Sequence, residues 1–200
     1  MVVKQKLLLD QQSLDPNEIL VAEFEYIATT AFQANEDRAR VSNYYLMTAG
    51  AAVAAILGAK IGDIIPPAIY LGFAVVFGAL AIIGLLTVLQ LARLRSAWRS
   101  SAQAMNQIKD YYRERCPDAQ LEKAFAWTTE TLPPGKKRNS VAFMLALSVV
   151  LVDTGAAVAG AAFMGVAMSW TLSQIWPLLV LVGVVFSGIQ FKLYFDWVAK

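Results

Sequence analysis

Four stretches of the chain are strongly apolar and carry at most one charged residue each, at about residues 43–59, 68–91, 141–168 and 176–195. Hydrophobic residues make up 58% of the chain and charged residues 16%, against about 45–50% and about 25% in a typical globular domain. A helix of about 20 apolar residues crosses a hydrocarbon core of roughly 30 Å. We therefore expect an all-α integral membrane protein whose four transmembrane helices form a bundle.

Apolar residues also recur with heptad spacing next to the first two spans. The first seam consists of Leu20, Phe24, Ile27, Ala31, Ala34, Arg38, Val41 and Tyr45. The second consists of Leu94, Trp98, Ser101, Met105, Ile108 and Tyr112. This period is typical of a helix that packs along one partner. No helix breaker separates either seam from its span, so we expect two continuous helices whose cytosolic extensions pair as a helical-hairpin stalk.

Arg38 is the only charged residue of the first seam. One interpretation is a snorkelling side chain that pairs with a nearby acid. The other is a polar residue that fixes the register of the stalk, as single polar residues do in coiled coils.

Breakers and caps divide the chain into four segments. Asp15-Pro16 begins the first long helix, Pro66-Pro67 follows the first span, Cys116-Pro117 ends the second extension, and Asn139 or Ser140 caps the third span. The predicted segments are a flexible N-terminus (1–16), a long-helix hairpin with the first two spans (17–115), a cytosolic linker with a short amphipathic helix (116–139), and the last two spans (140–200).

The basic residues are unevenly distributed, although the net charge is only +2. Ten of the 17 Lys and Arg residues lie between Arg93 and Arg138, and the two short turns between paired spans contain only Lys60. The positive-inside rule therefore places both termini and the central segment in the cytoplasm, for a multi-pass protein of the inner (plasma) membrane. Acidic residues are interleaved with this basic segment, so a nucleic acid is not expected as a partner.

The chain lacks the residues that several kinds of metal binding and catalysis require. The chain has no histidine and one cysteine, which excludes a Cys/His zinc site and a disulfide within the chain. It also lacks a Walker-type glycine loop and a nucleophile elbow. We therefore expect no enzymatic activity, no cofactor and no metal.

Asp153 lies midway along the third apolar stretch. An ionised carboxylate at that depth costs at least roughly 2.5–3.5 kcal/mol, which makes it a candidate functional residue. It could be neutral and bonded to Thr154 or Ser148, or to Ser187 or Gln190 of the fourth span. It could instead face water or an ion in an oligomeric pore.

Small residues recur every four positions in two spans. The rows are Gly50, Ala54 and Gly58 in the first span, and Ala157, Ala161 and Gly165, with a parallel row of Ala156 and Gly160, in the third. Helices in lipid associate through close backbone approach over such residues. The rows predict packing either between spans of one chain or between copies, so a homo-oligomer in the bilayer is expected.

Parts of the sequence resemble bacterial membrane proteins. Glu25-Tyr26 and residues 35–45 (NEDRARVSNYY), which lead into a span with small residues, resemble the start of the first span in proteins of the SLATT type and of the related octameric RipA family. Residues 104–112 (AMNQIKDYY) and 131–134 (TLPP) resemble uncharacterised bacterial multi-span proteins. The resemblance implies a bacterial inner-membrane oligomer, and SLATT-type domains imply a membrane-perturbing effector in nucleotide-signalled defence against phage. SLATT-type proteins usually have two spans, and no functional residue carries over.

Three hypotheses of function follow. The first is an oligomeric, ion channel-like module that forms a pore or perturbs the membrane, as in bacterial defence. The second is a membrane scaffold whose stalk binds a cytosolic protein. The third is a small transporter, although no broken helix or inverted repeat is evident.

Overall fold

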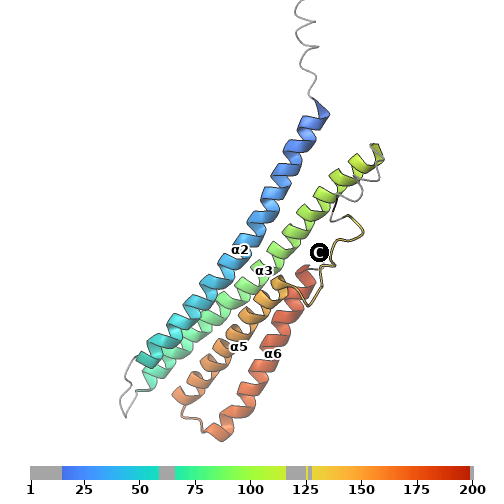
Figure 1. The fold of residues 1–200 in the computed structure, drawn as a ribbon. Helices are drawn as coiled ribbons and strands as arrows, with labels where there is room; N and C mark the ends of the chain where they lie inside the picture. Colours follow the sequence, from blue (N-terminus) through green and yellow to red (C-terminus); the bar gives the residue numbers. More distant parts are fainter. Residues whose placement is uncertain (1–14, 59–65, 116–124, 126–127, 199–200) are drawn as a thin grey trace, which may run out of the picture. The chain divides into compact units, whose positions relative to one another are not determined.

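The computed structural model describes residues 15–58, 66–115, 125 and 128–198 of the chain. The regular structure of these residues is entirely helical, in four segments drawn in Figure 1: α2 (Pro16–Gly58), α3 (Pro67–Arg115), α5 (Val141–Ala167) and α6 (Leu172–Val198). All four helices are long and apolar enough to cross a membrane by length and composition. The predicted all-α fold with four membrane helices is confirmed, and the chain is a multi-pass membrane protein.

Both long helices run without a break, as the sequence predicts. α2 contains 43 residues and α3 contains 49. The Asp15 side chain accepts a hydrogen bond from the backbone N–H of Asn17 at 2.9 Å, and Pro16 takes the first helical position, where no intrahelical donor is needed. Residues 1–14 and most of the predicted linker helix, with Cys116, lie outside the described residues.

The chain divides into two compact units, and both long helices contribute to each of them. The first unit takes in residues up to Gln33 and Trp98–Pro133. The second takes in Ala34–Ala97 and Pro134–Lys200, and so contains segments of all four helices. The buried Arg38, Arg95, Asp153 and Gln190 all belong to this second unit.

In the first unit, α2 and α3 line the same shallow groove. The groove has a volume of about 300 Å³, with Leu20 and Ile27 contributed by α2 and with Ile108 and Tyr111 contributed by α3. Ile27 and Ala31 on the predicted α2 seam are buried. These contacts agree with pairing of the two helical extensions, whereas the stalk on the cytosolic side of a membrane stays a prediction.

The seam predicted on α3 is displaced by about one position. Its members Leu94, Ser101 and Met105 are only partly buried, whereas Ala102 and Asn106 are almost fully buried. The predicted seam does not include Asn106, because a heptad pattern of apolar residues gives no signal for a buried polar side chain. Burial along α3 depends on the direction in which each side chain leaves the helix, so a polar residue can belong to the buried row.

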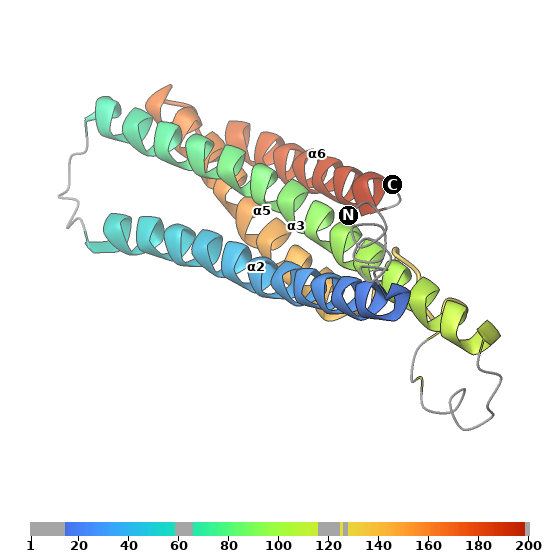
Figure 2. The ribbon, with the colours of Figure 1, turned by 90° about the horizontal axis from the view of Figure 1, so that it is seen from above.

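Within the second unit, the four helical segments lie side by side, and α5 contacts the other three (Figures 1 and 2). Gly160 of α5 lies against α3, because a Cβ at this glycine would stand 3.4 Å from the backbone nitrogen of Gly78 and 3.5 Å from the carbonyl oxygen of Ala74. Small residues on both helices therefore allow close backbone approach, as expected for packing in lipid.

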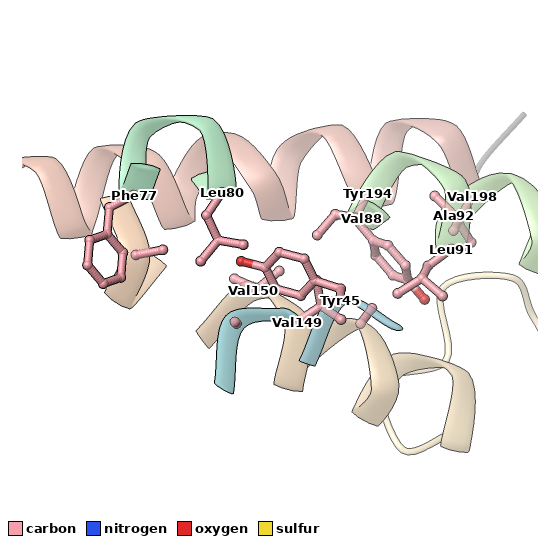
Figure 3. Packing of buried hydrophobic residues seen from close by; sticks show 13 residues of the cluster. Tyr45, Phe77, Leu80, Val88, Leu91, Ala92, Val149, Val150, Tyr194 and Val198 are labelled. Carbon is pink, nitrogen blue, oxygen red and sulfur yellow. The ribbon is translucent and has the colours of Figure 1, made fainter. Parts of the chain in front are cut away.

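The core of this unit is built from aromatic residues, leucine, valine and alanine. Figure 3 shows the ring of Tyr45 of α2 among Leu80 of α3 and Val149 and Val150 of α5. Further along the same core, Tyr194 of α6 packs among Val88, Leu91, Ala92 and Val198. The two tyrosines place polar oxygens inside this cluster of apolar side chains.

α5 and α6 form a hairpin whose turn has a defined geometry. The Ser140 hydroxyl caps the start of α5 by accepting from the Phe143 N–H at 3.3 Å, which confirms one of the two predicted caps. At the other end, Ser169 has a φ of 59°, and the Trp170 N–H donates to the Gly165 carbonyl at 3.0 Å. This is a Schellman motif with serine in the left-handed position that normally favours glycine.

Replacing Ser169 with glycine should stabilise the protein by about 1 kcal/mol, because glycine adopts the left-handed conformation without the steric cost that a Cβ carries. Thermal unfolding followed by helical circular dichroism in one detergent would measure the change. Ser169→Ala keeps the Cβ and serves as the control, with no gain expected. A glycine variant no more stable than the alanine variant would contradict the assignment.

Candidate functional site

The carboxyl group of Asp153 lies at the centre of the second unit. Asp153 is 0% exposed, although it occupies the middle of a helix made otherwise of apolar and small residues. The Tyr45 hydroxyl of α2 donates to its Oδ1 at 2.8 Å, across a separation of 108 residues. The second oxygen, Oδ2, is buried and has no hydrogen-bond partner among the described residues.

Gly84 of α3 provides the space for this carboxyl group. A Cβ built at Gly84 would overlap all three terminal atoms of the Asp153 side chain. The carboxyl group therefore sits directly against the α3 backbone, and no residue larger than glycine fits at position 84 without moving it.

Gln190 of α6 completes the group. It is 0% exposed, and its amide interacts with the Asp153 carboxyl group. Neither of its polar atoms makes a direct hydrogen bond to the described residues, so the two groups face each other without pairing closely. Tyr45, Gly84, Asp153 and Gln190, one from each helix, are called the Asp153 site below.

The structure separates the other predicted partners from this site. The Ser187 hydroxyl donates to the Val184 carbonyl at 3.2 Å, and the Ser148 hydroxyl donates to the Leu145 carbonyl at 2.8 Å. Both serines thus bond their own helix. The Thr154 hydroxyl is buried without a partner. Of the proposed partners of Asp153, Gln190 is the one that faces its carboxyl group.

Sequence reasoning missed two members of the site. Tyr45 stands at the end of the first heptad seam, which gave a signal for burial but none for its partner. Gly84 gave no signal, because its role depends on a side chain from a helix far along the chain. An aspartate in an apolar span does call for a small residue on a neighbouring helix, but several glycines satisfy that description.

The two predicted rows of small residues differ in their surroundings. Gly50, Ala54 and Gly58 are exposed, and a Cβ at either glycine would meet nothing within 4 Å. This row does not pack against another span of the described chain, so packing within one chain does not apply to it. The row is exposed because it lies on the face of α2 opposite Tyr45 and Ala49, which are buried.

The rows on α5 do pack within the chain. Gly165 is buried against the Ile175 side chain, and Ala157 and Ala161 are partly buried. The most buried pair is the parallel row of Ala156 and Gly160. The prediction of packing between spans therefore applies to α5.

Buried polar residues of the second unit are confined to one half of it. They extend from the Asp153 site toward the end where the Arg95 guanidinium donates to the Lys137 carbonyl at 2.9 Å, which is called the basic end below. Besides the members of the site, they are Arg38, Ser42, Thr87, Arg95 and the largely apolar Tyr194. On α2 and α6, each of these residues lies three or four positions from the next one or from a member of the site, and so on the same helix face. On α3, Thr87 lies three positions from Gly84, and Arg95 follows eight positions later.

The opposite half is apolar at every buried position that the structure describes there, from Ala49 on α2 to Ile175 on α6. Phe163 closes it with three aromatic contacts to α3, at ring-centroid distances of 6.4 Å to Tyr70, 5.2 Å to Phe73 and 5.7 Å to Phe77. The Asp153 site is thus linked to the basic end by polar side chains and separated from the other end by packed rings.

The site has the chemistry to hold a proton or a small hard cation. Its acceptors are a carboxylate, an amide oxygen and a phenol oxygen, the ligand types that hard cations prefer. The described residues contain no cluster of three or more His, Cys, Asp or Glu side chains suited to a metal ion. Because Asp153 is fully enclosed by its own four helices, it does not line a pore between copies, contrary to that alternative.

Replacing Gly84 with alanine should lower the free energy of unfolding by about 1–3 kcal/mol, since the new methyl group overlaps the Asp153 carboxyl group. Gly72→Ala is the matched control on α3, because Gly72 is exposed with no atom within 4 Å of a Cβ. Thermal unfolding in one detergent would compare the two. Adding Asp153→Ala to the Gly84 variant should recover part of the loss, and equal stability of both glycine variants would contradict the contact.

Comparison of the chain with protein-family models, with curated proteins and with solved structures finds no match.

Proposed function

We propose that the protein conducts protons or small monovalent cations across the membrane, and that the path runs through the helices of each protomer at the Asp153 site. The supporting observation is a buried carboxyl group with an unpaired oxygen, facing a buried Gln190 amide with both polar atoms unpaired. Unpaired polar groups in an apolar interior are costly, and an ionisable residue inside a membrane span is a candidate for a proton or ion site.

The one-sided distribution of polar residues supports this proposal. Side chains on α2, α3 and α6 continue from the site toward the basic end, whereas aromatic packing around Phe163 closes the other end. An ion that reaches Asp153 enters from the basic end. Passage to the other side requires movement at the Phe163 rings, so conduction is gated.

We place the basic end and both termini in the cytoplasm of an inner (plasma) membrane. Support comes from the positive-inside rule together with the position of Lys136, Lys137 and Arg138, which are exposed beside the start of α5. A fusion reporter near residue 130 would report the side of the membrane.

We also propose that the protein forms a homo-oligomer through the exposed Gly50, Ala54 and Gly58 face of α2. This face meets nothing within the described chain, and small residues allow a second helix to approach closely. The oligomer and the ion-conducting activity fit the membrane-perturbing effector implied by the SLATT-type resemblance, which stays a hypothesis. No catalytic role is proposed.

The scaffold hypothesis has weaker support. The seam that motivated it is partly covered within the first unit, where Ile27 and Ala31 are buried. Exposed aromatic side chains at Tyr26 and Phe32 of α2 are the remaining feature that favours a protein partner there.

Liposomes that contain the purified protein should show ion flux above that of empty liposomes, measured with internal pH-sensitive and sodium-sensitive dyes under the corresponding gradients. Asp153→Asn should lower the flux at least about tenfold, because it removes the only carboxyl group of the site. Gln190→Leu should also lower it, and Tyr45→Phe should have an intermediate effect.

Ser187→Ala is the matched control, since its hydroxyl bonds its own helix on α6, and its flux should equal that of the wild type. The response of the two dyes distinguishes a proton from sodium. Flux equal to that of empty liposomes under both gradients, or equal flux in the wild type and Asp153→Asn, would refute the proposal.

Replacing Gly50 and Gly58 together with leucine should reduce the mass of the particle in detergent, because bulky side chains prevent close approach of a second α2. Light scattering coupled to size exclusion would measure the protein mass. Gly72→Leu on the exposed face of α3 is the control and should leave the mass unchanged. A wild-type protein with the mass of a monomer would contradict the proposed homo-oligomer.

A further inference from the structure

Two arginines are buried together near the basic end of the second unit. Arg38 of α2 and Arg95 of α3 are each only 7% exposed. They lie within electrostatic range of each other, so their like charges repel. Buried positive charges normally have a carboxylate partner, because desolvation of an unpaired ion is costly.

Neither arginine has such a partner among the described residues. Ion pairs among these residues join Arg40 to Asp37 and Arg113 to Asp110. Arg38 instead donates to the Asn35 side-chain oxygen, and its Nε is buried without a partner. Two positive charges in this interior are therefore not neutralised by the protein.

The partners of Arg95 hold its guanidinium in a fixed orientation. Nη1 donates to the Tyr194 hydroxyl at 3.0 Å, and Nη2 donates to the Lys137 carbonyl at 2.9 Å. Tyr194 is 1% exposed and accepts this bond, so its own O–H proton stays available to another acceptor. Fixed donors with spare capacity are what recognition of an oxyanion requires.

Further positive charge surrounds this group. The Arg93 guanidinium lies 4.5 Å from the ring centre of Trp197, and that of Arg138 lies 5.7 Å from the ring centre of Phe195. Both stack on the last turns of α6, beside Tyr194. Basic pockets between membrane helices, flanked by aromatic residues at the headgroup level, bind anionic lipid headgroups.

We propose that Arg38, Arg95 and Tyr194 bind a phosphate-type oxyanion, carried either by the headgroup of an anionic phospholipid or by a free phosphate ion. The anion neutralises the two buried guanidiniums and accepts a hydrogen bond from the Tyr194 hydroxyl. The site is separate from Asp153, and its existence does not depend on ion conduction.

The test compares thermal unfolding of the full-length protein in nanodiscs of phosphatidylcholine with and without phosphatidylglycerol, and in phosphatidylcholine nanodiscs with inorganic phosphate or with chloride at equal ionic strength. Phosphatidylglycerol should raise the Tm of the wild type by about 2–8 °C. An equal rise with inorganic phosphate would identify a free oxyanion as sufficient, whereas a rise with lipid alone would identify the headgroup.

Arg38→Gln and Arg95→Gln should each lose most of this rise. Arg40→Gln is the matched control on α2, because the Arg40 side chain is 61% exposed, and it should keep the rise. If either buried variant fails to fold, the wild-type comparison still decides: no stabilisation by phosphatidylglycerol or by phosphate overturns the proposal. The proposal is also overturned if Arg40→Gln loses the rise in Tm to the same extent, or if Arg38→Gln and Arg95→Gln both keep it.

Discussion

Lipid supplies no hydrogen-bond partners, and this constraint governs the second unit. The Asp153 carboxyl group must find its partners inside the protein, so helices distant in sequence have to meet around it. Tyr45 supplies a donor, Gly84 supplies room, and Gln190 covers the remaining side. The contact fixes the register of α5 against three neighbours more strictly than apolar packing would, since sliding by one residue would leave the carboxyl group against a side chain.

If both proposals hold, the anion site and the Asp153 site act on each other through charge. A cation on the proposed path from the basic end to Asp153 would pass the Arg38 and Arg95 guanidiniums, whose field opposes it in a medium of low dielectric constant. An oxyanion bound there would lower that barrier, so we expect the lipid composition to affect how readily the carboxyl group exchanges with solution.

Sequence patterns predicted the helices well because long apolar runs and breakers are local signals. Asp153 and Gln190 stood out for the same reason, as polar residues inside apolar runs. The partnership of Asp153 with Tyr45 and Gly84 could not be predicted, because it depends on the relative register of helices that are separated by long stretches of chain. The burial of Arg95 could not be predicted either, because burial is set by the direction of the side chain from the helix axis rather than by its charge.

The position of Asp153 on the third of four spans has a consequence for biogenesis. When α5 leaves the ribosome, α2 and α3 have already been made, so the hydroxyl of Tyr45 and the gap at Gly84 exist before the carboxyl group needs them. A span with a central aspartate partitions from the translocon into lipid with difficulty. A hydroxyl donor and a space for the carboxyl group are thus present on helices made earlier, so we expect the order of synthesis to ease insertion of α5.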